Sequence, residues 1–443
     1  MFYEKFGIEK GSVTGITGSG GKTSLMFLLA EELANKGKVL VTTTTKIYEP
    51  LKEQYEILFL SDSNEEIKGN GKNIFIFVSK KVDGKLISPN EEELLKIKSK
   101  YDYILYEGDG AKEKLLKFWK EDEPVIFSFT NNIIGILNIK AKNLEFSEEN
   151  IHRYNMYMNK NNKFFQKKNI DDEILKDYLI NGEFFKNFSG KKVLFLNGVE
   201  NISEIKTALN FSNDLENFMF GSVKEKKIYV PKKISAIIMG SGKSERFNGN
   251  KLLSKIDGVS MIEIILKKLS SIPFKNIFVT YKDKEVFDIC KKYNVIPLEN
   301  KNYFLGQSES IKLGVSKIKD ENMMFFTGDM PFLKEETIIK LILEFDNEIV
   351  IPMVNNKKFS PVIFPQRYKE NLMKLFGDIG GKEIIKKEKN VGKWPWYKRD
   401  NALRGSNRPP LRVGRFTPPH RPLSRSEERR VGKECRSRWS PYH

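Results

Sequence analysis

The chain has 443 residues, 40% of them hydrophobic, which is longer than one hydrophobic core usually grows and excludes a wholly disordered protein. It has no apolar run of the roughly 18 residues that a membrane span needs, no apolar signal-type start and only two cysteines, so we expect a cytoplasmic protein without a disulfide framework or a membrane partner. The net charge of +18 would suggest nucleic-acid binding, but the last 53 residues carry 14 Lys and Arg against 4 Asp and Glu, so we expect no nucleic-acid partner for the remainder.

The first 120 residues alternate apolar strand patterns with helical patterns, which is typical of a parallel sheet covered by helices. The expected elements are strands over residues 12–17, 38–45, 73–79 and 101–108, and a helix over residues 24–37. A Lys- and Asn-rich stretch follows, with one clear strand at KKVLFLNG, and then a polar stretch up to about Lys233. We therefore expect a first α/β domain over residues 1–225.

A glycine-rich segment, GITGSGGKTS from Gly15 to Ser24, follows a β-branched run and opens a helix. In that context backbone N–H groups and the helix N-terminus bind phosphate, although an incidental glycine turn is the alternative. Ile16 stands where the usual P-loop has glycine, and the loop is similar to the GTNGKT type of ATP-dependent Mur ligases. We expect this P-loop to bind ATP, with Lys22 at the β- and γ-phosphates and Thr23 on Mg²⁺. The nucleotide-binding residues would be Gly18, Ser19, Gly20, Gly21, Lys22, Thr23 and Ser24.

Two carboxylates, Glu107 and Asp109, follow the apolar strand in YDYILYEGDGA. An acidic residue at such a strand end assists Mg²⁺ in P-loop proteins, so each is a candidate metal ligand beside Thr23. A solvated turn at the strand end is the alternative. Further along, His152 and Arg153 are candidate contacts of a substrate or phosphate, although a lone histidine is more often structural.

Five segments of this domain together resemble the YqeC family, the accessory proteins associated with selenium-dependent molybdenum hydroxylases. They are GITGSGGKTS, TTTTKIYEP, YEGDGAKEKLLKFWKEDEPVI, His152-Arg153 and VLFLNGVEN, and the resemblance runs from about Lys10 to Gly221. It implies a maturation role, with an apo-molybdenum hydroxylase as partner. The FLNGVEN segment departs from the NKxD signature of guanine recognition, so GTP is not supported for this domain.

A second alternation of strands and helices begins at Ile234. The expected strand segments cover residues 234–242, 276–282, 323–329 and 348–354, and the expected helices cover residues 261–272, 285–294 and 335–345. This pattern is a complete α/β layer structure in itself. We therefore expect a second, Rossmann-like domain over residues 232–390.

The loop after the first strand of this domain, in ISAIIMGSGKSERFNGNKLLSKIDG, resembles the LAAGxSxRxGxxK loop of the MobA-like molybdenum cofactor nucleotidyltransferases. Further segments resemble the same family: MMFFTGDMPF, NYFLGQSESIKLGV, SPVIFP and GDIGGKEII. Asn248 stands where the family has glycine, and an unrelated Rossmann-like domain is the alternative.

The resemblance implies roles for particular residues. Backbone N–H groups of Gly240, Ser241 and Gly242 would bind the nucleotide, and Arg246 and Lys251 would neutralise its triphosphate. Asp329 inherits the role of the carboxylate that holds Mg²⁺, so the catalytic set would be Asp329, Arg246 and Lys251.

The MGSG start of this loop is nearer the small-residue loop of cytidylyltransferases than that of guanylyltransferases, so we expect CTP rather than GTP. The expected reaction is transfer of CMP from CTP to molybdopterin-bound molybdenum, with release of pyrophosphate. Two alternatives remain: a nucleotide-dependent factor that delivers or inserts the cofactor without transferase activity, and a nucleotidyltransferase for another phosphorylated acceptor.

Residues 391–443 differ from the rest of the chain. They contain 3 Lys and 11 Arg, whereas residues 1–390 contain 59 Lys and 3 Arg, and they lack an apolar period. The segment RSEERRVGKECRSRWSPYH is similar to an in-frame translation of a sequencing-library adapter; a natural basic arm is the alternative. We expect residues 391–443 to be unstructured and foreign, replacing the Asp-rich stretch with which family members continue.

Overall fold

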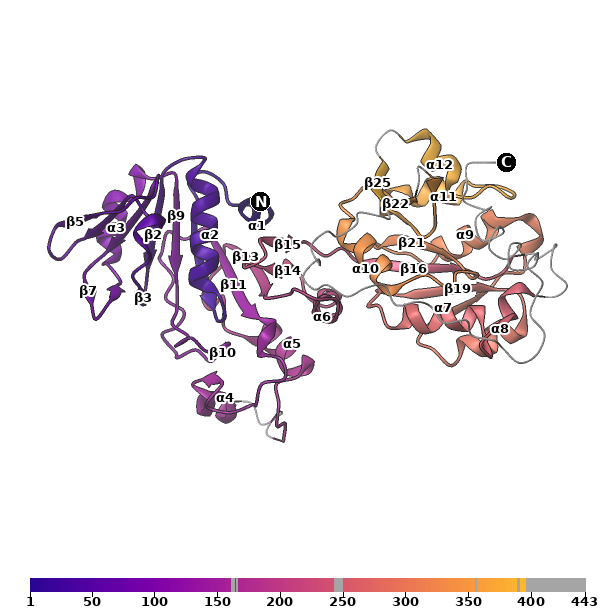
Figure 1. Ribbon diagram of the computed structural model, residues 1–443, viewed down its shortest axis with the longest axis horizontal. Coiled ribbons are helices and arrows are strands. Elements are labelled where there is room, and N and C mark those ends of the chain that lie inside the picture. The colour runs from indigo at the N-terminus through magenta and orange to yellow at the C-terminus, as the bar shows by residue number, and fades with distance from the viewer. Residues whose placement is uncertain (161–163, 165, 243–249, 355–356, 389–390, 396–443) are drawn as a thin grey trace, which may run out of the picture. The chain divides into compact units, whose positions relative to one another are not determined.

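The computed structural model describes residues 1–160, 164, 166–242, 250–354, 357–388 and 391–395. The chain divides into two compact units, Met1–Pro231 and Lys232–His443, and each is considered by itself. Both units are mixed α/β structures with parallel strand pairing (Figure 1). The prediction of an α/β protein with parallel sheets is therefore confirmed.

The first unit is built on one ten-stranded sheet. Its strands are β1 (Val13–Gly18), β2 (Val39–Thr43), β4 (Ile57–Leu60), β5 (Glu65–Lys68), β6 (Ile74–Val78), β9 (Tyr103–Glu107), β11 (Asn132–Asn138), β13 (Lys191–Asn197), β14 (Phe218–Ser222) and β15 (Lys227–Tyr229). Their order is β15-β14-β13-β11-β1-β9-β2-β6-β4-β5. All pairs from β14 to β4 are parallel, and the two edge strands β15 and β5 are antiparallel to their neighbours. The first unit therefore extends beyond residue 225, because β15 pairs with β14.

Helices and small sheets complete the first unit. The helices are α1 (Phe2–Phe6), α2 (Lys22–Ala34), α3 (Glu91–Ile97), α4 (Tyr154–Lys160), α5 (Asp172–Asn181) and α6 (Ile202–Ser212). A three-stranded sheet contains β3 (Lys46–Tyr48), β7 (Lys81–Val82) and β8 (Lys85–Ile87), and a two-stranded sheet contains β10 (Leu116–Lys117) and β12 (Ile151–His152).

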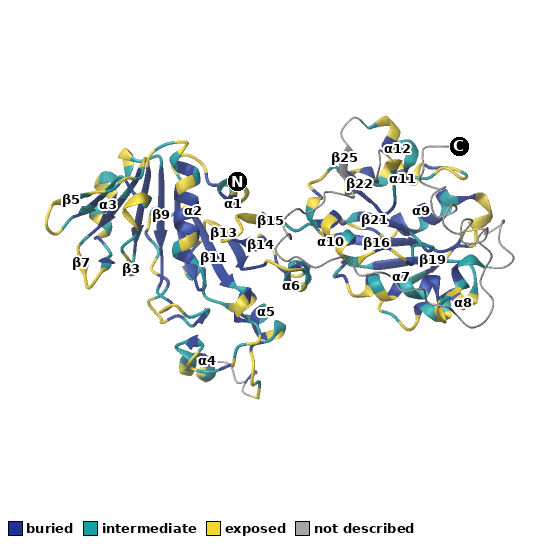
Figure 2. Ribbon diagram, in the orientation of Figure 1, coloured by how far each residue is buried: buried dark blue, intermediate teal, exposed yellow. Residues whose placement is uncertain are grey.

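Both faces of the central strands of the ten-stranded sheet are buried, as their dark blue colour in Figure 2 shows, whereas the edge strand β5 is mostly exposed. Successive residues of a strand point to opposite faces. In β9, Leu105 belongs to the core cluster that contains α1 and α2, whereas Ile104 and Tyr106 belong to a second cluster that contains Leu94 of α3. This burial on both sides explains the nearly continuous apolar sequence of the central strands.

The second unit has an eight-stranded sheet. Its strands are β16 (Ile234–Met239), β19 (Ile277–Tyr281), β20 (Ile296–Glu299), β21 (Asn322–Thr327), β22 (Ile349–Val354), β23 (Lys357–Lys358), β24 (Val362–Phe364) and β25 (Val391–Pro395). Along the main path the order is β20-β19-β16-β21-β24-β22-β23, with β25 also paired to β22. Strands β20, β19, β16 and β21 are mutually parallel, whereas β24 is antiparallel to both β21 and β22.

Within the described residues of the second unit, a small hairpin and six α-helices accompany the sheet, together with short 3-10 helices at Lys251–Leu253, Tyr303–Leu305 and Gln366–Tyr368. The hairpin strands are β17 (Lys255–Ile256) and β18 (Val259–Ser260), and the α-helices are α7 (Met261–Ser270), α8 (Lys284–Cys290), α9 (Gln307–Val315), α10 (Glu335–Glu344), α11 (Lys369–Met373) and α12 (Lys382–Lys387).

The expectation that the chain is unstructured from Val391 onward is wrong for its first five residues. Residues Val391–Pro395 form β25, which pairs in parallel with β22 from Ile349 to Met353. An edge strand offers unpaired backbone groups that another extended segment can satisfy, whatever that segment's apolar pattern. The rest of the expected segment, residues 396–443, lies outside the described residues.

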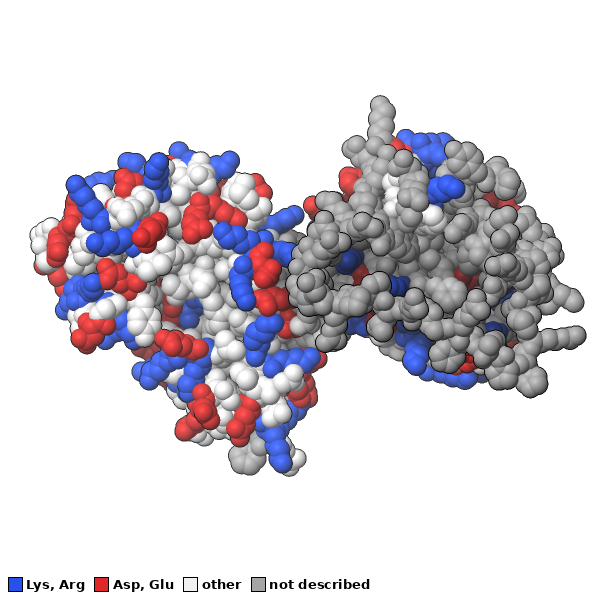
Figure 3. Space-filling model, in the orientation of Figure 1, with Lys and Arg blue, Asp and Glu red and all other residues white. Residues whose placement is uncertain are grey.

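Two features of the described residues bear on the classes of function considered above. Within them, no helix is both long and apolar enough to cross a bilayer. On the face of the first unit that Figure 3 shows, Lys and Arg side chains are interspersed with Asp and Glu. That face therefore carries a mixed surface rather than a field of one sign.

Candidate functional site

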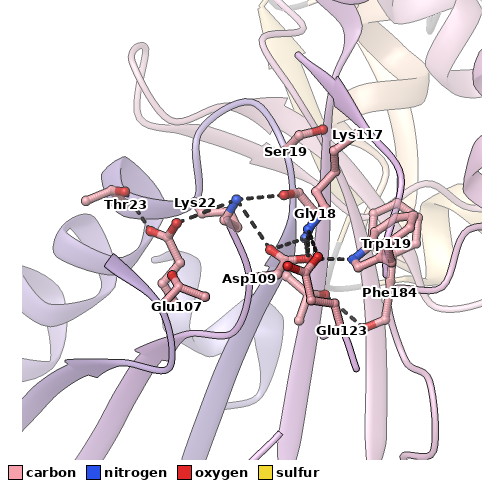
Figure 4. Close-up of polar contacts among 12 residues, drawn as sticks. Gly18, Ser19, Lys22, Thr23, Glu107, Asp109, Lys117, Trp119, Glu123 and Phe184 are labelled. Carbon is pink, nitrogen blue, oxygen red and sulfur yellow. Dashed lines mark hydrogen bonds and ion pairs between the residues drawn. The ribbon is translucent and has the colours of Figure 1, made fainter. Parts of the chain in front are cut away.

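The first site is the loop Gly18–Gly21 between β1 and α2, which we call the glycine loop (Figure 4). The φ angles of Gly20 and Gly21 are 81° and 126°. A Cβ atom on Gly20 would lie 2.4 Å from Asn138 Cβ, and one on Gly21 would lie 2.4 Å from Asn197 Nδ2. Both the backbone conformation and the space therefore require glycine.

Two asparagines from neighbouring strands hold the glycine loop. Asn138 ends β11 and Asn197 ends β13, and each donates a side-chain N–H to the Gly20 carbonyl over 3.0 Å. Ser19 donates its backbone N–H to the Ile136 carbonyl over 2.9 Å. Since β1, β11 and β13 are successive parallel strands, their carboxyl ends meet at one edge of the sheet, which places both asparagines beside the loop.

Lys22, the first residue of α2, is 5% exposed and directs its side chain back toward the glycine loop. Its Nζ donates to the Gly18 carbonyl over 2.7 Å. The same Nζ lies 3.3 Å from Asp109 Oδ1 and 3.6 Å from Glu107 Oε1. A buried ammonium in this position can neutralise an anion held by the backbone N–H groups of the loop.

Thr23 and Glu107 lie side by side next to the loop. Thr23 Oγ1 donates to Glu107 Oε2 over 2.7 Å. Glu107 is the last residue of β9 and is aligned with Ile16 of β1, so the strand pairing brings it to the start of α2. Burial raises the pKa of Glu107, and this outweighs the opposite effects of Lys22 and Thr23.

Asp109 is completely buried and surrounded by donors. Both of its carboxylate oxygens accept the Gly18 N–H over 3.0 Å, and Trp119 Nε1 donates to Oδ2 over 2.5 Å (Figure 4). Lys117 Nζ lies 3.1 Å from the same Oδ2. Asp109 is thus the more heavily hydrogen-bonded of the two carboxylates predicted to bind metal, and its contacts anchor the glycine loop to the segment that follows β9.

Beyond Asp109, buried side chains of alternating charge continue away from the loop. Lys117 bridges Asp109 to Glu123, whose Oε2 lies 3.0 Å from Lys117 Nζ, and Glu123 also accepts from Arg153 Nη2 over 2.7 Å. Burial alone would raise the pKa of Glu123, but Arg153 and Lys117 lower it to about 2. Burial lowers the pKa of Lys117. Three cationic side chains thus compensate the charges of three carboxylates, since a buried charge is stable only when it is paired. The cations are Lys22, Lys117 and Arg153, and the carboxylates are Glu107, Asp109 and Glu123.

The two residues proposed as substrate contacts lie at the far end of these charges. Arg153 is engaged with Glu123 and also donates from Nη1 to the Phe118 carbonyl over 3.0 Å. His152 is aligned with Lys117 in the β10–β12 pair. Burial, and then the positive charge of Arg153, lower the pKa of His152 to about 4.

The second site lies in the second unit, where β16 and β21 run in parallel with Met239 aligned to Thr327. Just beyond these strand ends, Lys251 Nζ donates to Asp329 Oδ2 over 3.0 Å. The Gly240 N–H donates to the Thr280 carbonyl, at the end region of β19, over 2.9 Å. The start of the second glycine-rich loop and the Lys251–Asp329 pair therefore share the sheet edge at which open α/β folds bind ligands.

Ser241 is held by a buried group of hydrogen bonds. Its Oγ lies 2.7 Å from Ser310 Oγ, and Asn300 Nδ2 donates to it over 2.9 Å. These contacts attach the second loop to α9 and to the residue that follows β20. Gly242 is exposed, and Arg246 lies outside the described residues.

The oxygen donors of the two sites suit a metal ion that is bound mainly through the phosphates of a nucleotide. Among the residues that the structure describes, no group of three or more His, Cys, Asp and Glu side chains is arranged to hold a metal ion. Mg²⁺ is commonly bound by one or two carboxylates with phosphate and water oxygens completing its shell. Asp329 in the second unit, and Thr23 with Glu107 in the first, fit that mode.

Several residues of these sites are not evident from the sequence. Asn138 and Asn197 are polar residues at the ends of apolar runs, as Glu107 is. That position at a strand end is the sequence signal that could have marked them as site residues. Lys117 lies among charged residues in KEKLLKFWKEDE, where nothing indicates that its side chain is completely buried. Trp119 and Asn300 likewise acquire their polar contacts only through packing of distant segments.

Comparison with known proteins covers both units. Residues 14–155 match the family model for the YqeC protein, and residues 236–391 match that for the MobA-like NTP transferase domain. The uncharacterized protein YqeC of Escherichia coli K12 is 32% identical over 155 residues, which are 34% of this chain and 60% of that protein.

Two relatives of the second unit bear the name probable molybdenum cofactor guanylyltransferase. The protein of Natranaerobius thermophilus is 32% identical over 127 residues, covering 28% of this chain and 61% of its own length. That of Aquifex aeolicus is 29% identical over 115 residues, covering 26% of this chain and 55% of its own length. The chain thus spans 55% to 61% of these three relatives.

Proposed function

The chain is a fusion of a YqeC domain with a MobA-like NTP transferase domain, and on that premise we propose that its second unit transfers CMP from CTP to a molybdopterin-type cofactor. The observation that carries the proposal is the Lys251–Asp329 pair, at 3.0 Å, beside the Gly240 loop at the carboxyl edge of the sheet. A cation, a carboxylate and a glycine-rich loop are the groups that a nucleotidyl transfer uses for positioning and charge compensation.

In this reaction a phosphate oxygen of the acceptor attacks the α-phosphorus of CTP, and the bond to the β-phosphate oxygen breaks, so that pyrophosphate leaves. Backbone N–H groups of Gly240, Ser241 and Gly242 would orient the triphosphate, and Lys251, with Arg246, would compensate the charge that develops on pyrophosphate. Mg²⁺, held through Asp329, would supply further charge compensation on the phosphates. Ser241 is suited to its part because Ser310 and Asn300 fix its side chain.

Two arguments favour CTP. The small residues Gly240 to Gly242, which follow β16, are similar to the small-residue loop of cytidylyltransferases, and a YqeC domain points to hydroxylase maturation, where the cytosine dinucleotide cofactor is expected. The two relatives of the second unit are probable guanylyltransferases by name, so GTP is the competing substrate.

For the first unit we propose a P-loop role: ATP binds at the glycine loop, and the nucleotide state governs delivery of the matured cofactor to an apo-molybdenum hydroxylase. Lys22 would contact the β- and γ-phosphates, and Thr23 with Glu107 would hold Mg²⁺. Of the two carboxylates, Glu107 is favoured over Asp109 because Asp109 already accepts from Gly18 and Trp119.

The test measures pyrophosphate release by the full chain with molybdopterin carrying molybdenum and either CTP or GTP. Release with CTP supports the proposal, and release with GTP alone would replace CMP transfer by GMP transfer. Release with neither nucleotide would favour a delivery factor without transferase activity. Lys22→Ala is the matched control, because it lies in the first unit and is expected to abolish ATP binding while leaving CTP-dependent release intact.

A further inference from the structure

A pocket of about 380 Å³ lies against α2 in the first unit, next to the glycine loop. Its wall comes from the first turns of α2, from the segment that follows β3, and from the β14–β15 hairpin. The volume is within the range of about 300–1,000 Å³ that is usual for small-molecule pockets. We infer that this pocket receives an amino-bearing nucleobase and its ribose, as part of the nucleotide whose phosphates bind the glycine loop.

The geometry of α2 links the pocket to the loop. Residues three and four positions apart along a helix share a face, so Ser24, Phe27 and Leu28 line the pocket together, whereas Lys22 points to Gly18 and Asp109. Thr23 takes part in both sites, because it lines the pocket and donates to Glu107. A nucleotide whose phosphates bind the glycine loop would therefore place its ribose and base in the pocket.

The lining has the chemistry of a nucleoside site. Phe27, Tyr48 and Val223 offer aromatic and aliphatic surface for a flat ring. The carboxylates of Glu31, which lies 3.8 Å from Lys226, and of Glu49, which also pairs with Lys81, add acceptors that can bind an exocyclic amino group and have no such partner on a base that carries a carbonyl in its place. Adenine presents that amino group and hypoxanthine does not, so ATP should bind better than ITP.

This inference rests on the proposed role of the glycine loop, and the experiment separates the two. Binding of Mg-ATP, Mg-ITP and tripolyphosphate to the full chain is measured by calorimetry in the wild type and in Lys22→Ala, Tyr48→Ala, Glu49→Gln and Leu51→Ala. Tyr48 and Leu51 are 58% and 70% exposed, so neither substitution opens the core, and Leu51 is the control because it belongs to the same segment but does not line the pocket.

Loss of base stacking in Tyr48→Ala should weaken ATP binding about tenfold or more, while tripolyphosphate binding and the Leu51→Ala variant stay at the wild-type level. Glu49→Gln should reduce the preference for ATP over ITP. If Tyr48→Ala binds ATP as the wild type does while Lys22→Ala does not, the pocket does not receive the base, and phosphate binding at the glycine loop is still supported. Unchanged ATP binding in Lys22→Ala would overturn both.

Discussion

Both carboxylate oxygens of Asp109 accept the backbone N–H of Gly18 over 3.0 Å, although the two residues are 91 positions apart in the chain. The contact joins the end of β1 to the segment after β9, and the same carboxylate is paired with Lys117 on its other side. A buried anion with cations and N–H donors around it stabilises the fold only while every partner is present.

Removing the charge of Asp109 should therefore destabilise the first unit. Asp109→Asn keeps the size of the side chain but leaves Lys117 with Glu123 as its remaining carboxylate partner among those described here. Breaking a buried pair costs about 3–5 kcal/mol when the other charge is left without a partner, and because Lys117 keeps Glu123 the loss should lie near the lower end of that range. Urea unfolding followed by tryptophan fluorescence would detect it. The exposed pair of Asp62 and Lys80, 3.7 Å apart, provides the control, since Asp62→Asn should cost less than about 0.5 kcal/mol. Equal effects of the two substitutions would contradict the buried-charge argument.

Glycine at position 20 should be required for space as well as for conformation. Gly20 and Gly84 have similar φ angles of 81° and 72°, but a Cβ atom meets Asn138 at Gly20 and nothing within 4 Å at Gly84. Gly84→Ala is thus a matched control that measures the left-handed backbone strain alone, about 1–2 kcal/mol. Gly20→Ala should cost about 1–3 kcal/mol more, because overpacking adds to that strain. Thermal unfolding of both variants checks this, and equal losses would mean that the Asn138 contact relaxes without cost.

His152 should make the first unit sensitive to acid. Burial and Arg153 lower its pKa to about 4, against 6.5 for the unperturbed side chain, so between these values the unfolded chain binds a proton that the folded protein does not. Stability should consequently be complete above pH 6.5 and fall as the pH drops toward 4. His152→Gln removes this term, and its unfolding free energy should fall less than that of the wild type between about pH 7.5 and about pH 5. A parallel decline in both proteins would assign the acid sensitivity to other groups.

Asp329 should matter for transfer far more than for folding. Asp329→Asn removes the charge that a bound Mg²⁺ requires, and pyrophosphate release should fall by orders of magnitude. The lost pair with Lys251 is partly exposed, at 14% for Lys251 and 25% for Asp329, so the unfolding free energy should change by less than about 1 kcal/mol. Asp320→Asn, a change at an exposed position of the same unit, is the control and should retain full activity. Near-normal turnover of Asp329→Asn would remove the metal role from this residue.

The sequence by itself determined the local elements and the residues at their ends. Short, nearly continuous apolar runs predicted β1, β9, β16 and β21, and runs with a helical period predicted α2, α7 and α10, because both patterns depend only on residues close together in the sequence. The ends of those runs pointed to Lys22, Glu107 and Asp329, and the resemblance of the second glycine-rich loop to the MobA-like loop pointed to Lys251. The structure brings Lys22 within 3.6 Å of Glu107, and Lys251 within 3.0 Å of Asp329.

Only the tertiary structure decided what surrounds those residues. The order β13-β11-β1-β9 brings Asn138 and Asn197 to Gly20, and the packing of the segment after β9 buries Lys117 between Asp109 and Glu123. Pairing with β22 makes a strand of Val391–Pro395, where composition indicated none. The physical reason is common to all three: strand order, burial and edge pairing depend on contacts between residues far apart in the chain, and local periodicity carries no information about them.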